Sequence, residues 1–200
     1  MQRILLVGKT GQVGWELERA LAPLGDVTAL DRGAMNLADP DSIRHAIRDS
    51  NPNVIVNAAA YTAVDKAESD ADLAMRINGV APGILAEEAK HCGPLLVHYS
   101  TDYVFDGAKA SPCSENDATG PINCYGRTKL AGEEAIRDAG GNYLIFRTSW
   151  VYSPRGNNFL RTMLRLAQER PELKVVDDQV GAPTSAKAIA NMTARVLETA

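Results

Sequence analysis

The chain has 200 residues, of which 45% are hydrophobic, and its 21 basic and 25 acidic side chains leave a formal charge of −4. This composition is typical of a globular chain with enough apolar residues for a core, and it excludes an intrinsically disordered or a collagen-like chain. No apolar run approaches the roughly 18 residues of a membrane span. The mild acidity gives no support to nucleic-acid binding.

The N-terminal residues and the cysteines indicate the compartment in which the protein works. The N-terminus reaches Gly8 after only four apolar residues, which is too short for the h-region of a signal peptide, so we expect no export. The cysteines are an odd number without CxxC spacing, at Cys92, Cys113 and Cys124. That usage fits a reducing compartment and argues against a disulfide framework or a zinc knuckle. We therefore expect a cytoplasmic protein.

Short β-rich runs alternate with longer helical patterns along the whole chain. The expected strands are 4–7, 27–30, 54–57, 95–99, 143–147 and 173–176. The expected helices are 11–24, 41–50, 70–92, 121–138, 157–169 and 185–199. A repeated βα order means parallel strands joined by right-handed crossovers, so we predict an α/β fold with a Rossmann-like doubly wound parallel sheet.

Two features of these elements support that fold and point to function. The strands that start at Ile4 and Val54 are continuously apolar instead of alternating, as expected when helices cover both faces of a sheet. One long loop, 102–120, is rich in Gly, Pro, Ser, Asp and Asn. A loop of that length is uncommon unless it has a function.

A glycine-rich turn, GKTGQVG from Gly8 through Gly11 to Gly14, follows the first expected strand and opens the first expected helix. Glycine permits the tight turn and lets backbone N–H groups approach a pyrophosphate, whose charge the positive end of the helix dipole favours. The GxxGxxG spacing lacks the GK[ST] ending of a Walker P-loop, which argues against an ATPase. We predict a dinucleotide-binding turn; the alternative is a glycine-rich connection that holds no ligand.

Asp31 closes the second expected strand, where an acidic side chain can accept hydrogen bonds from the hydroxyls of an adenosine ribose. This position favours NADH as the cofactor. Arg32 beside it can instead meet a 2′-phosphate, which leaves NADPH open. The alternative for both residues is a solvated Asp-Arg pair on the surface.

Small residues end the third expected strand, in the run Asn57-Ala58-Ala59-Ala60. Open α/β sheets bind ligands at the carboxyl ends of their strands, and small side chains there leave room for a cofactor. Close packing of a strand against a helix would also select alanine. The two interpretations are even.

Tyr125 and Lys129 stand four residues apart in a helical pattern, so their side chains project from one face about one turn apart. A free tyrosine has a pKa near 10 and is a poor acid-base group at neutral pH. A nearby ammonium stabilises the phenolate, so we expect Lys129 to lower the pKa of Tyr125. Such pairs are also frequent on solvated helices, and this one gains meaning only with the glycine turn upstream.

Together, the glycine turn, a Ser/Thr after the fourth strand and a YxxxK helix resemble the extended short-chain dehydrogenase/reductases, and the match runs through the whole chain. Four blocks resemble the dTDP-4-dehydrorhamnose reductases more narrowly: 57–65 (NAAAYTAVD), 100–107 (STDYVFDG), 147–152 (RTSWVY) and 179–184 (QVGAPT). Sugar-nucleotide dehydratases similar to this chain usually place an acidic pair after the Thr, whereas here Asp102 is followed by Tyr103. A plain reductase is therefore favoured.

The resemblance implies NAD(P)H-dependent reduction of the C4 ketone of dTDP-4-dehydro-β-L-rhamnose to dTDP-L-rhamnose, for a surface polysaccharide such as the O-antigen of lipopolysaccharide. Thr101 would hydrogen-bond the C4 carbonyl, Tyr125 would donate a proton to that oxygen, and Lys129 would hold the nicotinamide ribose. The implied substrate-binding residues are Thr101, Asp102 and Trp150. The implied cofactor-binding residues are Gly8, Thr10, Gly11, Gln12, Val13, Gly14, Asp31, Asn36, Leu37, Ala58, Ala60, Tyr61, Thr62, Tyr99, Tyr125 and Lys129.

Three of these residues have a structural alternative. Trp150 is alternatively a core residue, Asp102 a turn-former, and Tyr99 the solvent end of a strand.

Members of the family normally continue past the QVGAPT block into a smaller C-terminal lobe that closes over the sugar nucleotide, whereas this sequence stops at Ala200. We expect 1–200 to form the NAD(P)-binding domain with the catalytic Thr/Tyr/Lys set, and the C-terminal substrate lobe to be largely absent. The family also implies Mg²⁺, sometimes at a dimer contact, and a homodimer. No metal-ligand spacing is found among the histidines, which are His45, His91 and His98.

Two other functions remain open on the same residues. The regulatory partner of methionine adenosyltransferase also resembles this reductase and is a cofactor-binding module; the presence of Thr101, Tyr125 and Lys129 favours an enzyme instead. A nucleotide-sugar epimerase would return the hydride to its substrate and consume no cofactor. Nicotinamide absorbance with the keto sugar as substrate separates these functions.

Overall fold

The computed structural model describes residues 2–199. Its strands are β1 Gln2–Val7, β2 Gly25–Leu30, β3 Val54–Asn57, β4 Leu95–Thr101, β5 Tyr143–Thr148, β6 Val151–Tyr152 and β7 Thr184–Ser185. Its α-helices are α1 Gln12–Leu21, α2 Pro40–Ser50, α3 Val64–Ala67, α4 Ala71–Met75, α5 Ala81–Cys92, α6 Cys124–Ala139, α7 Phe159–Glu169 and α8 Ala186–Thr199. A π-helical turn, η1 Arg76–Val80, joins α4 to α5, and a 3₁₀ turn, η2 Asp102–Val104, follows β4.

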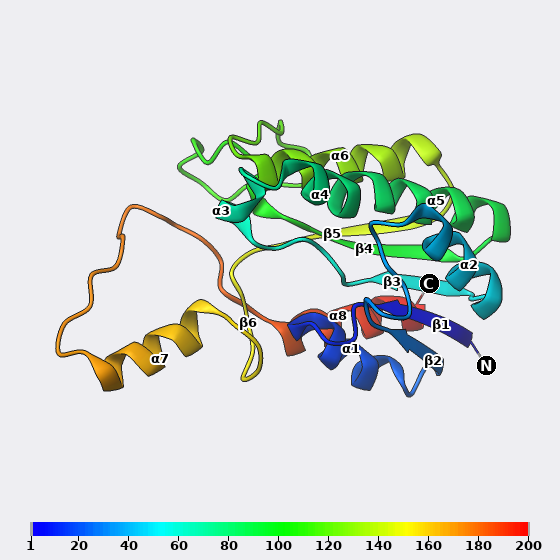
Figure 1. The fold of residues 1–200 in the computed structure, drawn as a ribbon, viewed down its shortest axis with the longest axis horizontal. Coiled ribbons are helices and arrows are strands. Elements are labelled where there is room, and N and C mark those ends of the chain that lie inside the picture. Colours follow the sequence, from blue (N-terminus) through cyan, green and yellow to red (C-terminus); the bar gives the residue numbers. More distant parts are fainter. Residues whose placement is uncertain (1, 200) are drawn as a thin grey trace.

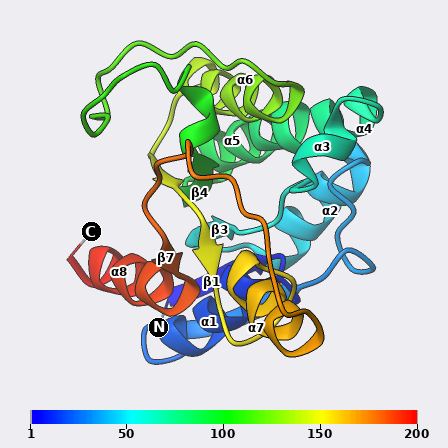
Figure 2. The ribbon, with the colours of Figure 1, turned by 90° about the vertical axis from the view of Figure 1, so that its left-hand side faces the viewer.

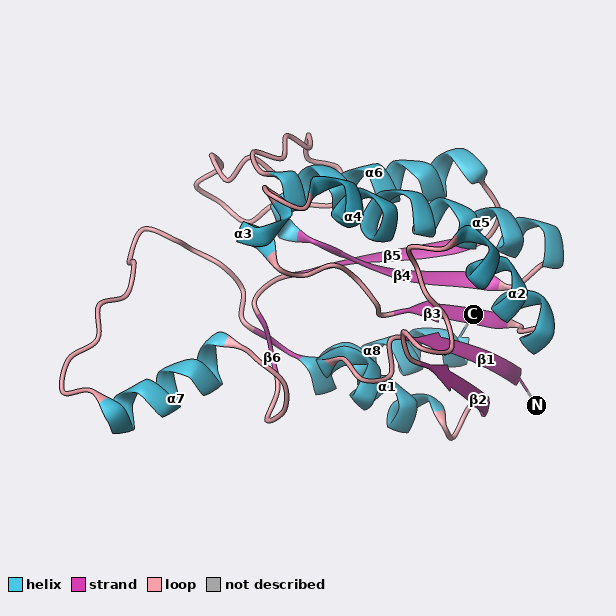
Figure 3. Ribbon diagram, viewed as in Figure 1, coloured by secondary structure: helices cyan, strands magenta, loops and turns pink. Residues whose placement is uncertain are grey.

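The five longer strands form one parallel sheet in the order β2-β1-β3-β4-β5 (Figure 3). The chain moves outward from β1 to β2, then returns to β3 on the other side of β1. The order therefore reverses between β1 and β3, and such a switch point opens a crevice at the carboxyl ends of the strands. The predicted α/β, Rossmann-like doubly wound fold is confirmed.

Helices cover both faces of the sheet, which explains why its central strands are continuously apolar. On one face, α2, α5 and α6 pack on residues such as Leu5, Ile55 and Leu96. On the other, α1 and α8 pack on residues such as Leu6 and Val56. Figures 1 and 2 show the two helix layers on opposite sides of the strands.

The expected strand 173–176 is wrong, because this segment has no regular structure. Its Val175 and Val176 are 52% and 67% exposed. A β-rich sequence forms a strand only where a neighbouring strand supplies backbone hydrogen-bond partners and a packing surface. The sheet ends at β5, and residues 173–176 do not pair with that edge strand. Instead, β6 and β7 form a separate two-stranded parallel sheet.

The expected helix 70–92 is present but is interrupted by the π-helical turn η1. A π-turn accommodates one extra residue and often marks a functional position. Here it places Asn78 against α6, where a Cβ on Gly132 would lie 2.1 Å from the Asn78 carbonyl oxygen. Hydrophobic periodicity does not reveal such a turn, because the apolar pattern continues on both sides of it.

Two expected helices begin later than predicted, because asparagine side chains cap them. Asn123 accepts from the N–H of Gly126, and α6 starts after it instead of at 121. Asn158 accepts from the N–H of Arg161 and starts α7. In Figure 1, α7 and the segment that follows it project away from the carboxyl ends of the strands.

Candidate active site

A cavity of about 720 Å³ opens at the carboxyl ends of the strands, beside the switch point between β1 and β3. Its volume lies within the usual range for ligand pockets, roughly 300–1,000 Å³. Among the predicted cofactor residues, those that line it are Gly8, Thr10, Gly11, Gln12, Val13, Asp31, Asn36, Leu37, Ala58, Ala60, Tyr61, Thr62, Tyr99, Tyr125 and Lys129. The fold therefore brings these residues, which lie far apart in the sequence, to a single cavity.

The glycine turn is shaped by close backbone packing. Gly8 has a φ of 91°, and a Cβ there would lie 2.8 Å from the Ala59 nitrogen. A Cβ on Gly14 would lie 2.0 Å from the Gly8 carbonyl oxygen, so Gly14 packs behind the turn and is not part of the cavity wall. A Cβ on Gly11 would meet only the Gly8 oxygen, at 3.4 Å. Two glycines thus make the turn, and Gly11 leaves open the space above the start of α1.

Asp31 follows β2 and lines the cavity, and its carboxylate has hydrogen-bond and ion-pair partners within the protein. Its Oδ1 accepts from the N–H groups of Gly33 at 3.0 Å and Ala34 at 3.2 Å. Its Oδ2 lies 3.6 Å from Lys9 Nζ. The backbone hydrogen bonds, followed by Lys9, lower the pKa of Asp31 below its ordinary value, so the group is a carboxylate at neutral pH. Arg32 lines the same cavity.

The alanine run after β3 both packs against the cores and leaves room in the cavity, so the two interpretations considered from the sequence hold together. Ala58 and Ala59 pack against the two hydrophobic cores, and Ala58, Ala59 and Ala60 all line the cavity. The segment that follows is held by Asn78. Asn78 Oδ1 accepts from the N–H of Tyr61 at 2.9 Å, and its Nδ2 donates to the Tyr61 carbonyl oxygen at 3.0 Å.

Tyr125 and Lys129 lie on α6 and both line the cavity, with exposed fractions of 9% and 1%. Burial raises the pKa of Tyr125 to about 12, although a hydrogen bond with Thr101 opposes this. The expected lowering of this pKa by Lys129 is wrong for this structure. Lys129 Nζ donates to the Tyr99 carbonyl oxygen at 2.7 Å and lies 3.1 Å from His98 Nε2, so its polar contacts are with β4.

The implied substrate residues gather beyond the cavity wall, where β4 ends. Thr101 Oγ1 donates to Asp102 Oδ1 at 3.1 Å, and Ser149 Oγ donates to Asp102 Oδ2 at 2.6 Å. Asp102 begins η2, so it also has the turn role considered from the sequence. Trp150 has a φ of 43° and is 45% exposed, so it is not a core residue.

Tyr99 is not the solvent end of a strand, because its side chain lies between β4 and α8. Its hydroxyl is 2.6 Å from Thr193 Oγ1. Burial raises the pKa of Tyr99, and the hydrogen bond with Thr193 only partly opposes this.

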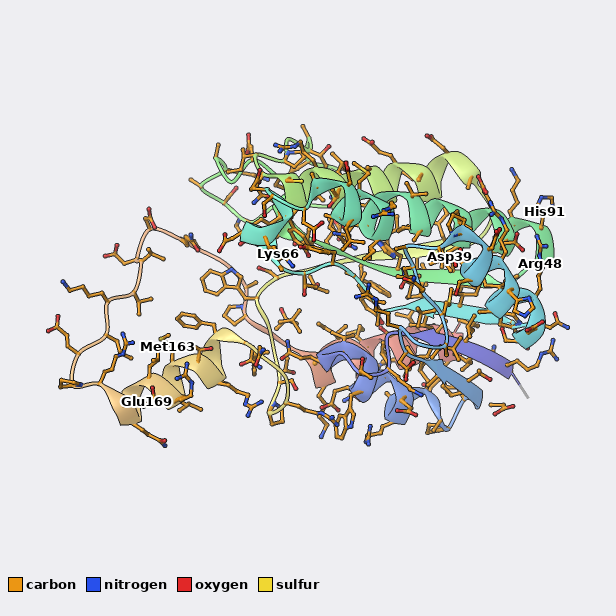
Figure 4. The ribbon with its side chains drawn as sticks, viewed as in Figure 1. Asp39, Arg48, Lys66, His91, Met163 and Glu169 are labelled. Atoms are coloured by element: carbon orange, nitrogen blue, oxygen red, sulfur yellow. The ribbon has the colours of Figure 1, made fainter. Side chains whose placement is uncertain are left out.

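Several polar residues that line the cavity are not among the predicted site residues: Lys66, Asp70, Ser100, Thr148 and Asn157. Ser100 and Thr148 belong to blocks that carried the family resemblance and were within reach of prediction. Lys66 lies within the short helix α3 and Asp70 follows that helix, and no spacing in the sequence pairs either residue with the glycine turn. Figure 4 places Lys66 toward the end of the sheet from which α7 projects, and Arg48 and His91 at the opposite end.

Within residues 2–199, no helix has the length and apolar content that crossing a bilayer requires. The histidine, cysteine and carboxylate side chains of the same residues form no group of three or more that could hold a metal ion.

The chain is similar to known proteins of one family. The family model described as the RmlD substrate binding domain matches residues 1–200. The dTDP-4-dehydrorhamnose reductase of Burkholderia thailandensis is 57% identical over 198 residues, which are 99% of this chain and 66% of that protein. The enzyme of the same name from Salmonella typhimurium is 53% identical over 201 residues, covering 98% of this chain and 67% of that protein. The chain thus spans about two thirds of the length of these curated relatives.

Solved structures that are similar to this chain include members of the same family. The crystal structure of dTDP-4-dehydrorhamnose reductase from Bacillus anthracis in complex with NADP has a TM-score of 0.95 and 37% identity, covering 99% of this chain and 71% of that one. A UDP-glucose 4-epimerase from Thermus thermophilus, with a TM-score of 0.82 but 21% identity, shares the fold alone. The predicted oxidoreductase family is confirmed: the chain belongs to the dTDP-4-dehydrorhamnose reductases.

Proposed function

We propose that the chain carries the cofactor-binding and catalytic part of an enzyme that reduces dTDP-4-dehydro-β-L-rhamnose to dTDP-L-rhamnose with NADPH or NADH. The observation that carries this proposal is one cavity that joins the glycine turn after β1 to the YxxxK pair of α6. Relatives that are 57% and 53% identical, both named for this reductase, support it. Residues 1–200 then form the NAD(P)-binding domain.

The cavity fits a dinucleotide. The pyrophosphate would lie over Gly11, where the backbone leaves open space and the N-terminus of α1 favours negative charge. The adenosine ribose would lie at Asp31, with Lys9 and Arg32 close enough to meet a 2′-phosphate. The nicotinamide would lie toward Tyr125 and Lys129. When bound, the cofactor supplies the hydride.

Tyr125 is suited to donate the proton. A ketone that accepts hydride becomes an alkoxide, which needs a donor beside it. Because the pKa of Tyr125 is about 12, the phenol keeps its proton at neutral pH and is available as a donor. Thr101, whose hydroxyl donates to Asp102 in this structure, would turn that hydroxyl to donate to the carbonyl oxygen of the substrate. Trp150, exposed near this point, would contact the sugar nucleotide.

The test follows nicotinamide absorbance with the keto sugar as substrate, using the chain extended by the last third that the curated relatives have. We expect consumption of NADPH or NADH in proportion to the alcohol formed. Interconversion of sugars without net cofactor consumption would indicate an epimerase. Cofactor binding without any turnover would indicate the regulatory-subunit alternative, which the reductase names of the relatives do not favour.

Four finer expectations stay predictions. They are a cytoplasmic location, a homodimer, use of the product in lipopolysaccharide, and a requirement for Mg²⁺. For Mg²⁺, residues 2–199 offer no group of three or more carboxylate, histidine or cysteine side chains that could hold the ion.

A further inference from the structure

A chain of buried polar side chains runs from β3 to α6 beneath the cavity. Asn57, His98 and Lys129 are each 1% exposed. Asn57 and His98 are partners in the parallel register of β3 and β4. Asn57 Nδ2 lies 3.1 Å from His98 Nδ1, and His98 Nε2 lies 3.1 Å from Lys129 Nζ. The mechanism proposed above uses only Lys129 of these three.

The backbone sets the direction of this hydrogen-bond chain. Asn57 Oδ1 accepts from the N–H of Ala59 at 3.2 Å, so the amide nitrogen is the atom that faces His98. An amide nitrogen only donates, and His98 Nδ1 must therefore accept. Burial by itself lowers the pKa of His98 well below 6.5, and any positive charge on Lys129 lowers it further, so the imidazole is neutral in either state of Lys129. The hydrogen-bond network thus assigns the proton of His98 to Nε2.

The Nε2–H group of His98 points at Lys129 Nζ. An ammonium has three donors and no acceptor, so it cannot accept this proton. The contact is a hydrogen bond only when Nζ is an uncharged amine, which accepts from His98 and donates to the Tyr99 carbonyl oxygen at 2.7 Å. Burial also shifts Lys129 toward the amine, because it lowers the pKa to about 8, so that amine and ammonium are equally populated at pH 8.

Burial and a neighbouring charge shift the pKa of Lys129 in opposite directions. Glu133, one turn further along α6, raises the pKa of Lys129 and partly opposes burial. Its carboxylate is, however, bound by Arg147 on β5 and by Arg137. The other titratable side chains that line the same cavity are Asp31, Arg32, Tyr61, Lys66, Asp70, Tyr99 and Tyr125.

We infer that Asn57 and His98 are positioning residues that favour the uncharged amine of Lys129 before the cofactor binds. This inference rests on the proposed contact of Lys129 with the nicotinamide ribose, which calls for an ammonium. On loading, the hydrogen bond from Nε2–H to Nζ breaks, and Nζ binds a proton that comes from the buffer through the cavity. No bond to carbon changes and nothing is oxidised or reduced.

The test counts protons when NADH binds to the 200-residue chain. NADH is the probe because it has no 2′-phosphate to titrate. Calorimetric titrations at pH 8 in buffers of different ionisation enthalpy should show uptake of about 0.5 proton, which rises toward 1 at pH 9, since the pKa of Lys129 is about 8. The control Lys187→Met, on the exposed side of α8, should keep this uptake.

Two variants identify the groups. Lys129→Met should remove the uptake while some NADH binding remains. His98→Gln should reduce the uptake at pH 8 at least twofold, because a glutamine oxygen can accept from an ammonium and stabilise the charged form before binding. Normal NADH binding with no proton uptake at pH 8 to 9 would overturn the inference. Complete absence of NADH binding would instead contradict the proposed function.

A spectroscopic readout covers the case in which His98→Gln fails to fold. Nitrogen-15 NMR distinguishes the two neutral tautomers of histidine, and the chain has only three histidines. We expect the signal of His98 to show the Nε2–H form at pH 9, where Lys129 is an amine because its pKa is about 8. The Nδ1–H form would overturn the inference.

Discussion

At the scale of single residues, the proposed chemistry depends most on Tyr125. Tyr125→Phe removes one hydroxyl and keeps the ring, including its edge-to-face contact with Tyr103 at 5.5 Å. Packing and cofactor affinity should survive, whereas turnover of the keto sugar by the extended chain should fall on the order of 10²–10⁴, the usual contribution of a general acid. The rate is measured by nicotinamide absorbance.

A matched control is Tyr143→Phe, which removes the same hydroxyl from an exposed tyrosine at the start of β5. Its turnover should equal that of the parent. If Tyr125→Phe also reduced the substrate at the parent rate, the proton donor would lie elsewhere.

Asp31 decides between cofactors. Asp31→Asn keeps an oxygen that can accept from Gly33 and Ala34, so the turn after β2 should persist, but it removes the negative charge near Lys9 and Arg32. NADH binding should weaken by roughly tenfold as a charged acceptor is lost, while NADPH binding improves or holds. Titrations with both cofactors measure the ratio. Equal losses for both would mean that Asp31 only shapes the turn.

At the scale of elements, substitutions at two glycines of the turn should affect stability and cofactor binding separately. Gly14→Ala places a methyl 2.0 Å from the Gly8 carbonyl oxygen, so the start of α1 must shift and stability should fall by about 1–3 kcal/mol. Gly11→Val meets little of the protein but fills the proposed space of the pyrophosphate. This variant should unfold near the parent temperature and lose NADH affinity, as followed by thermal unfolding and calorimetry. Unchanged affinity would place the cofactor elsewhere.

The joint between α6 and β5 depends on a buried carboxylate. Glu133 is 0% exposed and accepts from Arg147 at 2.9 and 2.7 Å and from Arg137 at 2.7 Å. Glu133→Ala leaves these guanidinium groups without their partner and should destabilise the fold by about 3–5 kcal/mol. Arg165→Ala, which breaks an exposed pair with Glu169 on α7, should cost about 0.5 kcal/mol or less. Denaturant titration compares the two.

The same carboxylate makes stability depend on pH. Burial works to raise the pKa of Glu133, but its hydrogen bonds, chiefly from Arg147, outweigh this and hold the pKa below 4.5. A lowered folded pKa gives stability that is present above pH 4.5 and is lost as the pH falls through the folded value. Glu133→Ala should therefore lose less stability between pH 5 and 3 than the parent does. An identical loss would exclude this carboxylate as the cause.

At the scale of the whole molecule, the cavity predicts that cofactor stabilises the fold. Its walls come from segments between Val7 and Asn157, so a bound dinucleotide would hold distant parts of the chain together. A ligand at 100 times its Kd adds about 2.7 kcal/mol, which raises the Tm of a chain of this size by about 5–10 °C. Thermal unfolding with NADPH measures the shift. Gly11→Val should show none, and an equal shift in that variant would indicate binding at another site.

The sequence by itself determined the layered α/β architecture, because helical and strand periodicities alternate and the central strands are apolar on both faces. It also determined the local parts of the site. The glycine turn and the Tyr125/Lys129 pair each lie within one loop or one helix, where spacing alone fixes relative position. The family followed from blocks of contiguous residues, for the same reason.

Only the tertiary structure decided the contacts between elements. The apolar run 173–176 remained irregular because no strand lies beside it, and local propensity carries no information about neighbours. Lys129 was expected to act on Tyr125, yet its amine contacts His98 and Tyr99, which lie 31 and 30 residues earlier on β4. Burial then moves the pKa of Tyr125 and of Lys129 in opposite directions. Desolvation and hydrogen-bond partners depend on which surfaces meet, and that is set by packing rather than by sequence spacing.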